Sequence, residues 1–149
     1  MAAISSISNG EAMSSVRTKL NSVITEINLL DPTDWIDYSA TSTVVGWTTP
    51  MTTKIIRYRV IGKQLFCIYN FNGTSNSTSV TFTLPNNLAN SNLRSFGFSI
   101  DNGTTIGSNL VSQNSGSNLI NVYKDNFAVN AWTASGSKLA YGQFFIEIA

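Results

Sequence analysis

Histidine is absent from this 149-residue chain, cysteine occurs once, and charged residues make up only 11% of it. Without histidine the chain lacks the commonest general base, the commonest metal ligand and every Ser-His-Asp arrangement. The single cysteine, Cys67, excludes an intramolecular disulfide, and we expect it to be a buried, reduced thiol. A lone thiol without a histidine partner is also a poor candidate for a nucleophile.

Carboxylates are few in the second part of the chain. Past residue 37 they are Asp101, Asp125 and Glu147. Asp101 and Asp125 stand at expected turns, where aspartate accepts hydrogen bonds from nearby backbone amides. A glycosidase site would need two of the three carboxylates a few ångströms apart. We predict instead that they are structural, that the protein is not an enzyme and that it needs no cofactor.

Three more aspartates, Asp31, Asp34 and Asp37, cluster after the first expected helix. A calcium ion prefers such oxygen ligands. Asp31 is also an ordinary helix stop, because it precedes Pro32 and a residue in that position disfavours the helical region. Turn chemistry accounts for the other two. We therefore predict no metal site, and the chain has no glycine-rich phosphate loop.

The net charge is only +1, so no strong field attracts nucleic acid or an acidic membrane. Arg57 and Arg59 share one face of an expected strand, which we interpret as a solvated face rather than a phosphate site. No run approaches the ~18 apolar residues of a membrane helix, and the first residues form no secretory signal. We expect synthesis in a cytoplasm without export by the usual route. Ser, Thr and Asn, roughly a third of the chain, supply an uncharged polar surface.

An apolar stripe with spacings of 3, 4, 3, 4 and 3 residues stands near the start of the chain. A mean spacing of about 3.5 residues is typical of a coiled-coil seam. Ser8 and Glu11 form a capping box before it, so we expect a helix from about Gly10 to Leu30. The alternative is an amphipathic helix that lies across its own domain. The seam consists of Met13, Val16, Leu20, Val23, Ile27 and Leu30.

The seam residues also indicate how many chains associate. Leucine at the first core position with a β-branched residue at the second disfavours two-stranded coils. Leu20 with Val23 fits this rule, and the neighbouring Ile24 widens the apolar face. We predict a parallel homotrimer. A seam of fewer than three heptads is too short to hold the chains alone, so the second part of the chain must contribute to assembly.

From about Trp35 to Ala149 the chain has the pattern of short β-strands separated by turns. Gly62-Lys63 and Asp101-Asn102-Gly103 are turn signals. One apolar face per strand favours a mainly β fold, an antiparallel, jelly-roll-like β-sandwich. Two segments alternate clearly, with Val80, Phe82 and Leu84 in one and Phe96, Phe98 and Ile100 in the other. The expected strands are 54–61, 65–72, 79–84, 94–100, 119–123, 127–132 and 139–148.

A binding role would depend on aromatic and amide side chains in loops, which stack on sugars and hydrogen-bond them. Most of the aromatic residues are expected in the core or in an interface, since a small domain needs their apolar area buried. The ligand-binding residues are therefore unknown from the sequence. The aromatic candidates are Trp35, Tyr38, Trp47, Tyr123, Trp132 and Tyr141.

Two stretches resemble bacteriophage structural proteins. Asn9-Gly10-Glu11-Ala-Met-Ser-Ser-Val16-Arg17-Thr-Lys19-Leu20-Asn21 resembles a short helical motif that recurs in phage fibre and tail proteins. Three further segments are similar to a β module at the C-terminal ends of phage tail fibres, head fibres and related appendages. They are Tyr38–Trp47, Ile61-Gly62-Lys63, and Gly73–Thr78 with Phe82–Pro85. The likeness covers residues 9 to 85.

The resemblance implies a homotrimeric fibre with a short coiled-coil stem and a β-sandwich head. Residues 1–9 would be a flexible peptide that attaches to other virion proteins of the capsid or tail, 10–31 the trimerisation helix and 32–149 the head. We therefore expect a phage virion structural protein that is made in the bacterial host cytoplasm. Its β head would project outward from the virion, where it could contact the host surface. The alternatives are a receptor- or glycan-binding module that relies on trimer avidity, and a capsid or tail decoration subunit without a ligand.

Overall fold

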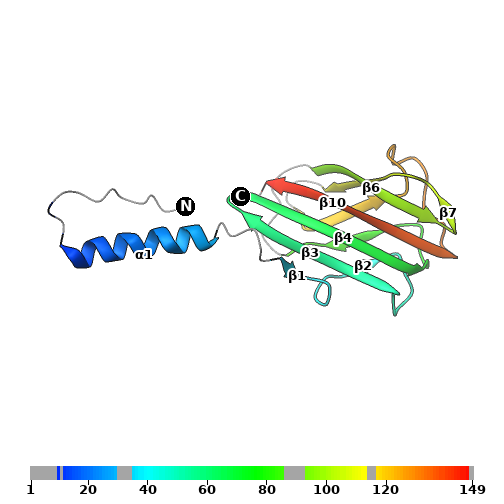
Figure 1. Cartoon of the computed structure of the whole chain (residues 1–149). Coiled ribbons are helices and arrows are strands. Elements are labelled where there is room, and N and C mark those ends of the chain that lie inside the picture. Colours follow the sequence, from blue (N-terminus) through cyan, green and yellow to red (C-terminus); the bar gives the residue numbers. More distant parts are fainter. Residues whose placement is uncertain (1–9, 11, 30–34, 86–92, 114–116, 148–149) are drawn as a thin grey trace. The chain divides into compact units, whose positions relative to one another are not determined.

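The computed structural model describes residues 10, 12–29, 35–85, 93–113 and 117–147 (Figure 1). The chain forms two compact units, Met1–Asp34 and Trp35–Ala149, each described here by itself. The expected attachment peptide, residues 1–9, and the expected capping box of Ser8 and Glu11 lie outside the described residues. Within the described residues, no helix is both long and apolar enough to cross a membrane.

The first unit contains one described helix, α1 (Met13–Leu29). The hydroxyl groups of Thr18, Ser22 and Thr25 each donate a hydrogen bond to the backbone carbonyl four residues earlier. Ser and Thr commonly satisfy their side chains in this way inside helices. The helix expected from about Gly10 to Leu30 is present, and it begins at Met13.

The second unit is built from antiparallel strands, which confirms the prediction of a mainly β, antiparallel fold. Ten strands form one curled sheet in the order β1-β3-β4-β10-β6-β8-β9-β5-β2, and β7 pairs with β6 beside this path. The strands are β1 (Ile36–Asp37), β2 (Val44–Val45), β3 (Thr53–Ile61), β4 (Gln64–Thr74), β5 (Thr81–Thr83), β6 (Leu93–Asp101), β7 (Thr104–Thr105), β8 (Asn109–Gln113), β9 (Leu119–Tyr123) and β10 (Ser137–Glu147).

The curled sheet encloses its core with inward side chains from strands that are distant in the strand order. Phe82 of β5 contacts Phe71 and Tyr69 of β4, with ring centroids 5.3 and 5.4 Å apart. Each fully buried ring of this kind stabilises the fold by about 1.5–3 kcal/mol. Val80, Phe82 and Leu84 all lie in this core, as the alternation of their segment predicts. The core residues are Trp47, Ile56, Leu65, Cys67, Tyr69, Phe71, Val80, Phe82, Leu84, Val111, Ile120, Val122, Trp132, Ala140, Phe144 and Ile146.

Cys67 is buried and free, as predicted. Burial raises the pKa of its thiol to about 12. The thiol therefore stays protonated at ordinary pH and packs as a small apolar side chain.

The second unit has two distinct ends, because its long strands β3, β4 and β10 run side by side (Figure 1). At one end, Ile61 pairs with Gln64, which in turn pairs with Glu147. Trp35 also lies there, since the Arg59 guanidinium is 5.0 Å from the centre of its ring. We call this the entry end. The opposite end, where Thr74 pairs with Ser137 and β6 turns into β7, is called the loop end.

One expected strand is wrong: residues 127–132 form part of a loop that connects β9 to β10. The carboxylate of Asp125 accepts hydrogen bonds from the backbone N–H groups of Phe127 and Val129, so these groups are unavailable to a sheet. Ala128 has a φ of +57°, which is incompatible with a strand. The alternating sequence is therefore overridden by a local aspartate-capped turn.

Four strands were not expected from the sequence: β1, β2, β7 and β8. Three of them have only two residues, too few to give a periodic pattern. β8 has five, but its buried positions include the polar residues Asn109 and Gln113. Asn109 is satisfied by the Phe98 carbonyl and the Tyr69 hydroxyl, which a sequence pattern cannot reveal.

Candidate functional site

The apolar seam of the first unit is partly accessible. Met13 and Leu20 have 75% and 53% of their surface exposed, and Val16 and Val23 are half-buried. Ile27 lies in α1, but its side chain falls outside the described residues, as does all of Leu30. A helix that shows large apolar side chains at heptad spacing is typical of one that associates with other helices.

A second apolar surface covers the outward side of β3, β4, β10 and β6 in the second unit. Side chains of a strand alternate between the two faces, and here the inward set fills the core while the outward set combines apolar side chains with polar ones such as Asn70, Gln143 and Arg57. Phe145 pairs with Phe66, and Tyr141 pairs with Phe98, with ring centroids 6.1 and 5.2 Å apart. We define the outer apolar face as Ile55, Phe66, Ile68, Phe96, Phe98, Ile100, Leu139, Tyr141 and Phe145, none of which is buried.

Strand β6 carries its apolar side chains on the outward side of the sheet and polar ones on the inward side. Phe96, Phe98 and Ile100 belong to the outer apolar face, and Phe96 is 61% exposed. The alternate residues Ser99 and Asp101 are buried. The apolar residues of this segment therefore lie on the outward side of the sheet, because polar partners inside the molecule satisfy the residues that point inward.

The outer apolar face ends in an aromatic stack near the entry end. The Arg59 guanidinium lies 5.0 Å from the ring centre of Trp35 and 5.4 Å from that of Phe66. A groove of about 350 Å³ lies beside this stack and is lined also by Gln143 and Phe145. Arg57 and Arg59 do share the outward face of β3, as predicted, but Arg59 stacks on rings rather than forming a simple solvated face.

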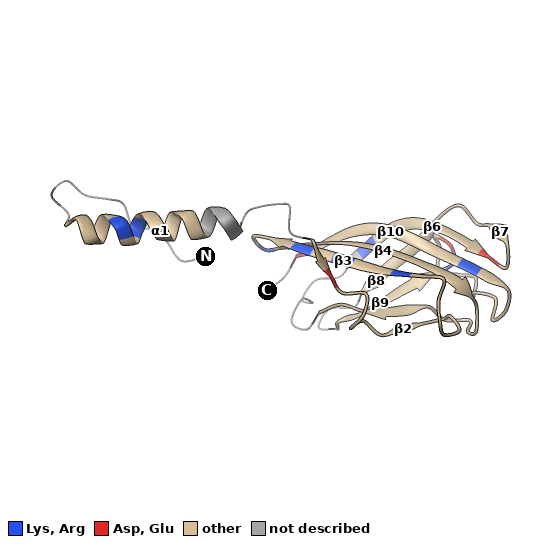
Figure 2. Cartoon of the chain, turned by 60° about the horizontal axis from the view of Figure 1, so that its bottom comes forward, with Lys and Arg blue, Asp and Glu red and all other residues tan. Residues whose placement is uncertain are grey.

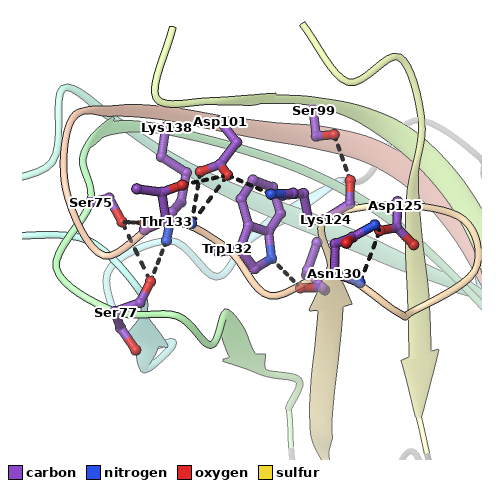
Figure 3. A network of polar contacts seen from close by, with 11 residues as sticks. Ser75, Ser77, Ser99, Asp101, Lys124, Asp125, Asn130, Trp132, Thr133 and Lys138 are labelled. Carbon is purple, nitrogen blue, oxygen red and sulfur yellow. Dashed lines mark hydrogen bonds and ion pairs between the residues drawn. The ribbon is translucent and has the colours of Figure 1, made fainter. Parts of the chain in front are cut away.

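Buried charge gathers at the loop end, where Lys138 of β10 has no exposed surface (Figure 3). Its Nζ donates hydrogen bonds to the carbonyls of Gly46, at 3.1 Å, and Ser77, at 2.8 Å. The same ammonium lies 5.4 and 5.1 Å from the ring centres of Trp47 and Trp132. These contacts offset the cost of removing an ammonium group from water.

Asp101 stands opposite Lys138 in the pairing of β6 with β10 and is also buried. Its carboxylate forms an ion pair with Lys124 at 3.1 Å and accepts hydrogen bonds from the N–H and Oγ1 of Thr133 at 3.1 and 3.0 Å. Burial lowers the pKa of Lys138 to about 8, and the negative charge of Asp101 acts in the opposite direction. We call Asp101, Lys124, Thr133 and Lys138 the buried polar cluster. It ties residues 124–136, the loop between β9 and β10, to the sheet.

The same loop is fixed internally by Asp125. Its carboxylate accepts hydrogen bonds from the backbone N–H groups of Phe127, at 3.0 Å, Val129, at 3.3 Å, and Asn130, at 3.1 Å, and from the Asn130 Nδ2, at 2.8 Å. These bonds, the Asn130 side chain first, lower the pKa of Asp125. The loop holds Phe127 and Val129 77% and 78% exposed. A structured loop that presents large apolar side chains to water is typical of a contact surface.

A groove of about 260 Å³ lies between this loop and strands β5 and β9. Its lining includes no charged residue. Six lining residues carry hydroxyl or amide side chains, and one of them, Asn130, donates its amide to Asp125. The side chains of the other five make no hydrogen bond to another described residue. They are Thr78, Ser79, Thr81, Asn121 and Tyr123.

Three of the carboxylates noted in the sequence, Asp37, Asp101 and Asp125, have structural roles. Asp101 and Asp125 both hold the loop at residues 124–136. Glu147 lies at the other end of β10 from Lys138, about 30 Å away at about 3.3 Å per residue, so it forms no acid pair with Asp101. Asp37 accepts a hydrogen bond from the N–H of Ser39 at 2.8 Å.

The alternative of a calcium site at Asp31, Asp34 and Asp37 falls mostly outside the described residues, which include Asp37 but not Asp31 or Asp34. In the part of the chain that is described, no three His, Cys, Asp or Glu side chains come together as metal ligands would.

The aromatic candidates divide between core and surface. Trp47 and Trp132 are buried, and Tyr38 packs edge-on against Tyr58 with ring centroids 6.0 Å apart. Trp35, Tyr123 and Tyr141 are partly exposed. The most exposed aromatic side chains, Phe96, Phe127 and Phe145, were missed as surface residues, because their alternation predicts a core position.

Comparisons of the chain with protein-family models, with curated proteins and with solved structures find no match.

Proposed function

We propose that this protein is a structural component of a bacteriophage virion, a short homotrimeric fibre made in the bacterial host cytoplasm. Residues 10–31 would form a parallel coiled-coil stem, and residues 32–149 a β-sandwich head that projects outward. The observation that carries the proposal is the heptad seam on α1, with Met13 and Leu20 largely exposed. Isolated helices of this length are marginal in water, so α1 needs a partner to be stable.

The head would be a jelly-roll-like sandwich. In support, Phe82 of β5 packs against Phe71 of β4 and Phe144 of β10, so two halves of the curled sheet share one core. Antiparallel strands with a common core are typical of such heads. Figure 2 shows that Lys and Arg are scattered and that most of the ribbon is neither basic nor acidic. A head with few charged residues fits the proposed structural role, which requires no charged ligand.

The stem is tested with two variants that add the same charge to α1. Leu20→Asp places a carboxylate in the seam, whereas Asn21→Asp places one on the exposed side of the helix. We expect light scattering on the full chain to give a trimer for the wild type and for Asn21→Asp, and a lower mass for Leu20→Asp. Equal masses for the two variants would contradict a seam at Leu20.

The virion role is tested by locating the chain on purified particles. Deletion of residues 1–9, the proposed attachment peptide, should abolish incorporation and leave the trimer intact. Incorporation without these residues would show that attachment lies elsewhere. A chain absent from particles would overturn the virion role without bearing on the trimer.

A second candidate function is recognition of a neutral host glycan, favoured by the groove between the loop at residues 124–136 and strands β5 and β9. Its uncharged lining and the hydroxyl and amide groups of Thr81, Asn121 and Tyr123 are the chemistry that sugars require. Trimer avidity would raise the affinity of a weak site. A glycan array on the wild-type protein, repeated with Asn121→Ala, tests it: binding that persists unchanged in the variant would exclude this groove.

A further inference from the structure

We propose that the outer apolar face is where the heads of neighbouring copies contact each other. This inference rests on the proposed trimer and names the surface through which the heads take part in it. The occupant of the face is a second copy of this chain.

The chemistry of the face favours contact with another apolar surface. Nine apolar side chains lie on one side of four paired strands, and Phe96 and Phe145 are 61% and 62% exposed. Three pairs stand directly opposite each other, namely Phe66 with Phe145, Tyr141 with Phe98, and Leu139 with Ile100. Monomeric proteins rarely leave such contiguous apolar surface in water. The same strands already bury an apolar inward side, so the core does not require the outward one.

The amides of the face can also pair between copies. Gln143 pairs with Ile68 in the strand register, and its side chain is exposed. Amides both donate and accept, so Gln143 of one copy can hydrogen-bond the same residue of another. Asn70, between Ile55 and Tyr141, does not contribute in this way, because its unpartnered Oδ1 has no accessible surface.

The short connection between α1 and the second unit favours the same chain as the partner. Five residues, 30–34, separate the end of α1 from Trp35, and even fully extended they allow about 22 Å between Leu29 and Trp35. Trp35 lies at the entry end, where it stacks with Arg59 and Phe66 beside the face. Copies joined through the seam would therefore hold their faces at high effective concentration.

The charged side chains of the face lie at its margins. The residues that pair across the middle of the face are Asn70, Gln143 and the apolar side chains themselves. Arg57 and Arg59 lie on β3, at one margin, and Arg94 lies on β6, at the other. The groove on β5 and β9 belongs to the other half of the sheet, so covering the outer apolar face leaves it accessible.

Cysteine cross-linking of the full chain tests the proposal. Gln143→Cys places a thiol in the centre of the face, and Ser112→Cys places one on β8, outside it. The wild type, whose Cys67 is buried, is the blank. A short bismaleimide should join Gln143→Cys chains into covalent dimers and leave Ser112→Cys chains mostly single. A trimer that cross-links through residue 112 and not through 143 would overturn the inference and leave the proposed trimer standing.

A second pair of variants measures the strength of the contact. Phe96→Ser with Phe145→Ser removes two rings from the face, and Phe127→Ser removes a still more exposed ring from the loop at residues 124–136. We expect the trimer of the double variant to dissociate at a concentration at least tenfold higher, and that of Phe127→Ser to be unchanged. Equal dissociation of the two would contradict the inference. A monomeric wild-type chain would instead contradict the proposed trimer.

Discussion

The outer apolar face and the groove on β5 and β9 lie on the same outward side of one curled sheet, yet their chemistry is opposite. Across β4, β10 and β6 the outward side chains are mostly aromatic or aliphatic, and two of the rings are more than 60% exposed. Across β5 and β9 the groove is bordered by Thr81 and Asn121, which pair directly with each other. Both halves border the same core, so the core does not account for the difference.

The two halves of the sheet are suited to different environments, the outer apolar face to another apolar surface and the groove on β5 and β9 to water. An apolar face gains free energy only when another apolar surface covers it. A groove lined with neutral hydroxyl and amide groups is stable in water and can exchange that water for a polar ligand. The contrast separates a surface suited to other copies of the chain from one suited to a solvated partner.

The largest effect on the free energy of unfolding is expected from removing a ring that points into the core. Phe82→Ala removes a fully buried ring and should lower the free energy of unfolding by about 3–5 kcal/mol. Phe145→Ala, with a ring that is mostly exposed, should leave the head's own stability nearly unchanged. Urea unfolding of both, in the Leu20→Asp background that weakens assembly, measures this. Similar losses would mean that Phe145 packs as a core residue.

The buried polar cluster should give the next largest effect. Asp101→Ala leaves Lys124 and Thr133 without their partner and should lower the free energy of unfolding by about 2–3 kcal/mol. It should also speed proteolysis near Phe127, because the loop loses its tie to the sheet. Asp125→Ala removes only the internal bonds of the loop and should cost about 1 kcal/mol. The reverse order would show that the loop depends on its own turn rather than on the cluster.

A smaller effect is expected in the groove. If it binds a neutral glycan, Thr81→Val and Asn121→Ala should each weaken binding by about 3–10-fold, the usual range for one hydrogen bond. Ser112→Ala, a polar change on β8 outside the groove, is the control. Titration of a glycan selected on an array gives the three affinities. A loss in the control as large as in the groove variants would place binding elsewhere.

The smallest effect concerns pH. The pKa of Lys138 is about 8 in the folded chain and 10.5 in the unfolded one, so above pH 8 the folded chain releases a proton that the unfolded chain keeps. The free energy of unfolding should therefore rise from pH 8 upward. Cys67 acts oppositely from its unfolded value of 9.0, because its thiol stays protonated when folded. Urea unfolding between pH 8 and pH 9 should show the rise in the wild type and not in Lys138→Met.

The strands that could be predicted from sequence are those with a clear alternation between glycine turns. β3, β4, β6, β9 and β10 lie within two residues of their expected bounds, β5 lies inside the expected 79–84, and Asn102 and Gly103 form the expected turn with φ values of +49° and +77°. These features depend on local periodicity and on turn residues, which a sequence displays directly.

The candidate surfaces could not be predicted, because alternation does not say which face points inward. Phe96 and Phe98 have the spacing of core residues, and only the pairing of β6 with β10 places them outside. The inward partners are Gly97 and Gly142. A Cβ added at either residue would lie 2.6 or 2.7 Å from the Tyr69 hydroxyl oxygen, so the sheet needs glycine there. Such a close approach between distant segments has no local signature.

The assembly itself is tested most directly by sedimentation equilibrium of the full wild-type chain at micromolar concentration. We expect a mass of three times that of the chain, since both the seam and the outer apolar face would then be covered. A monomer at this concentration would contradict both the stem and the contact between heads.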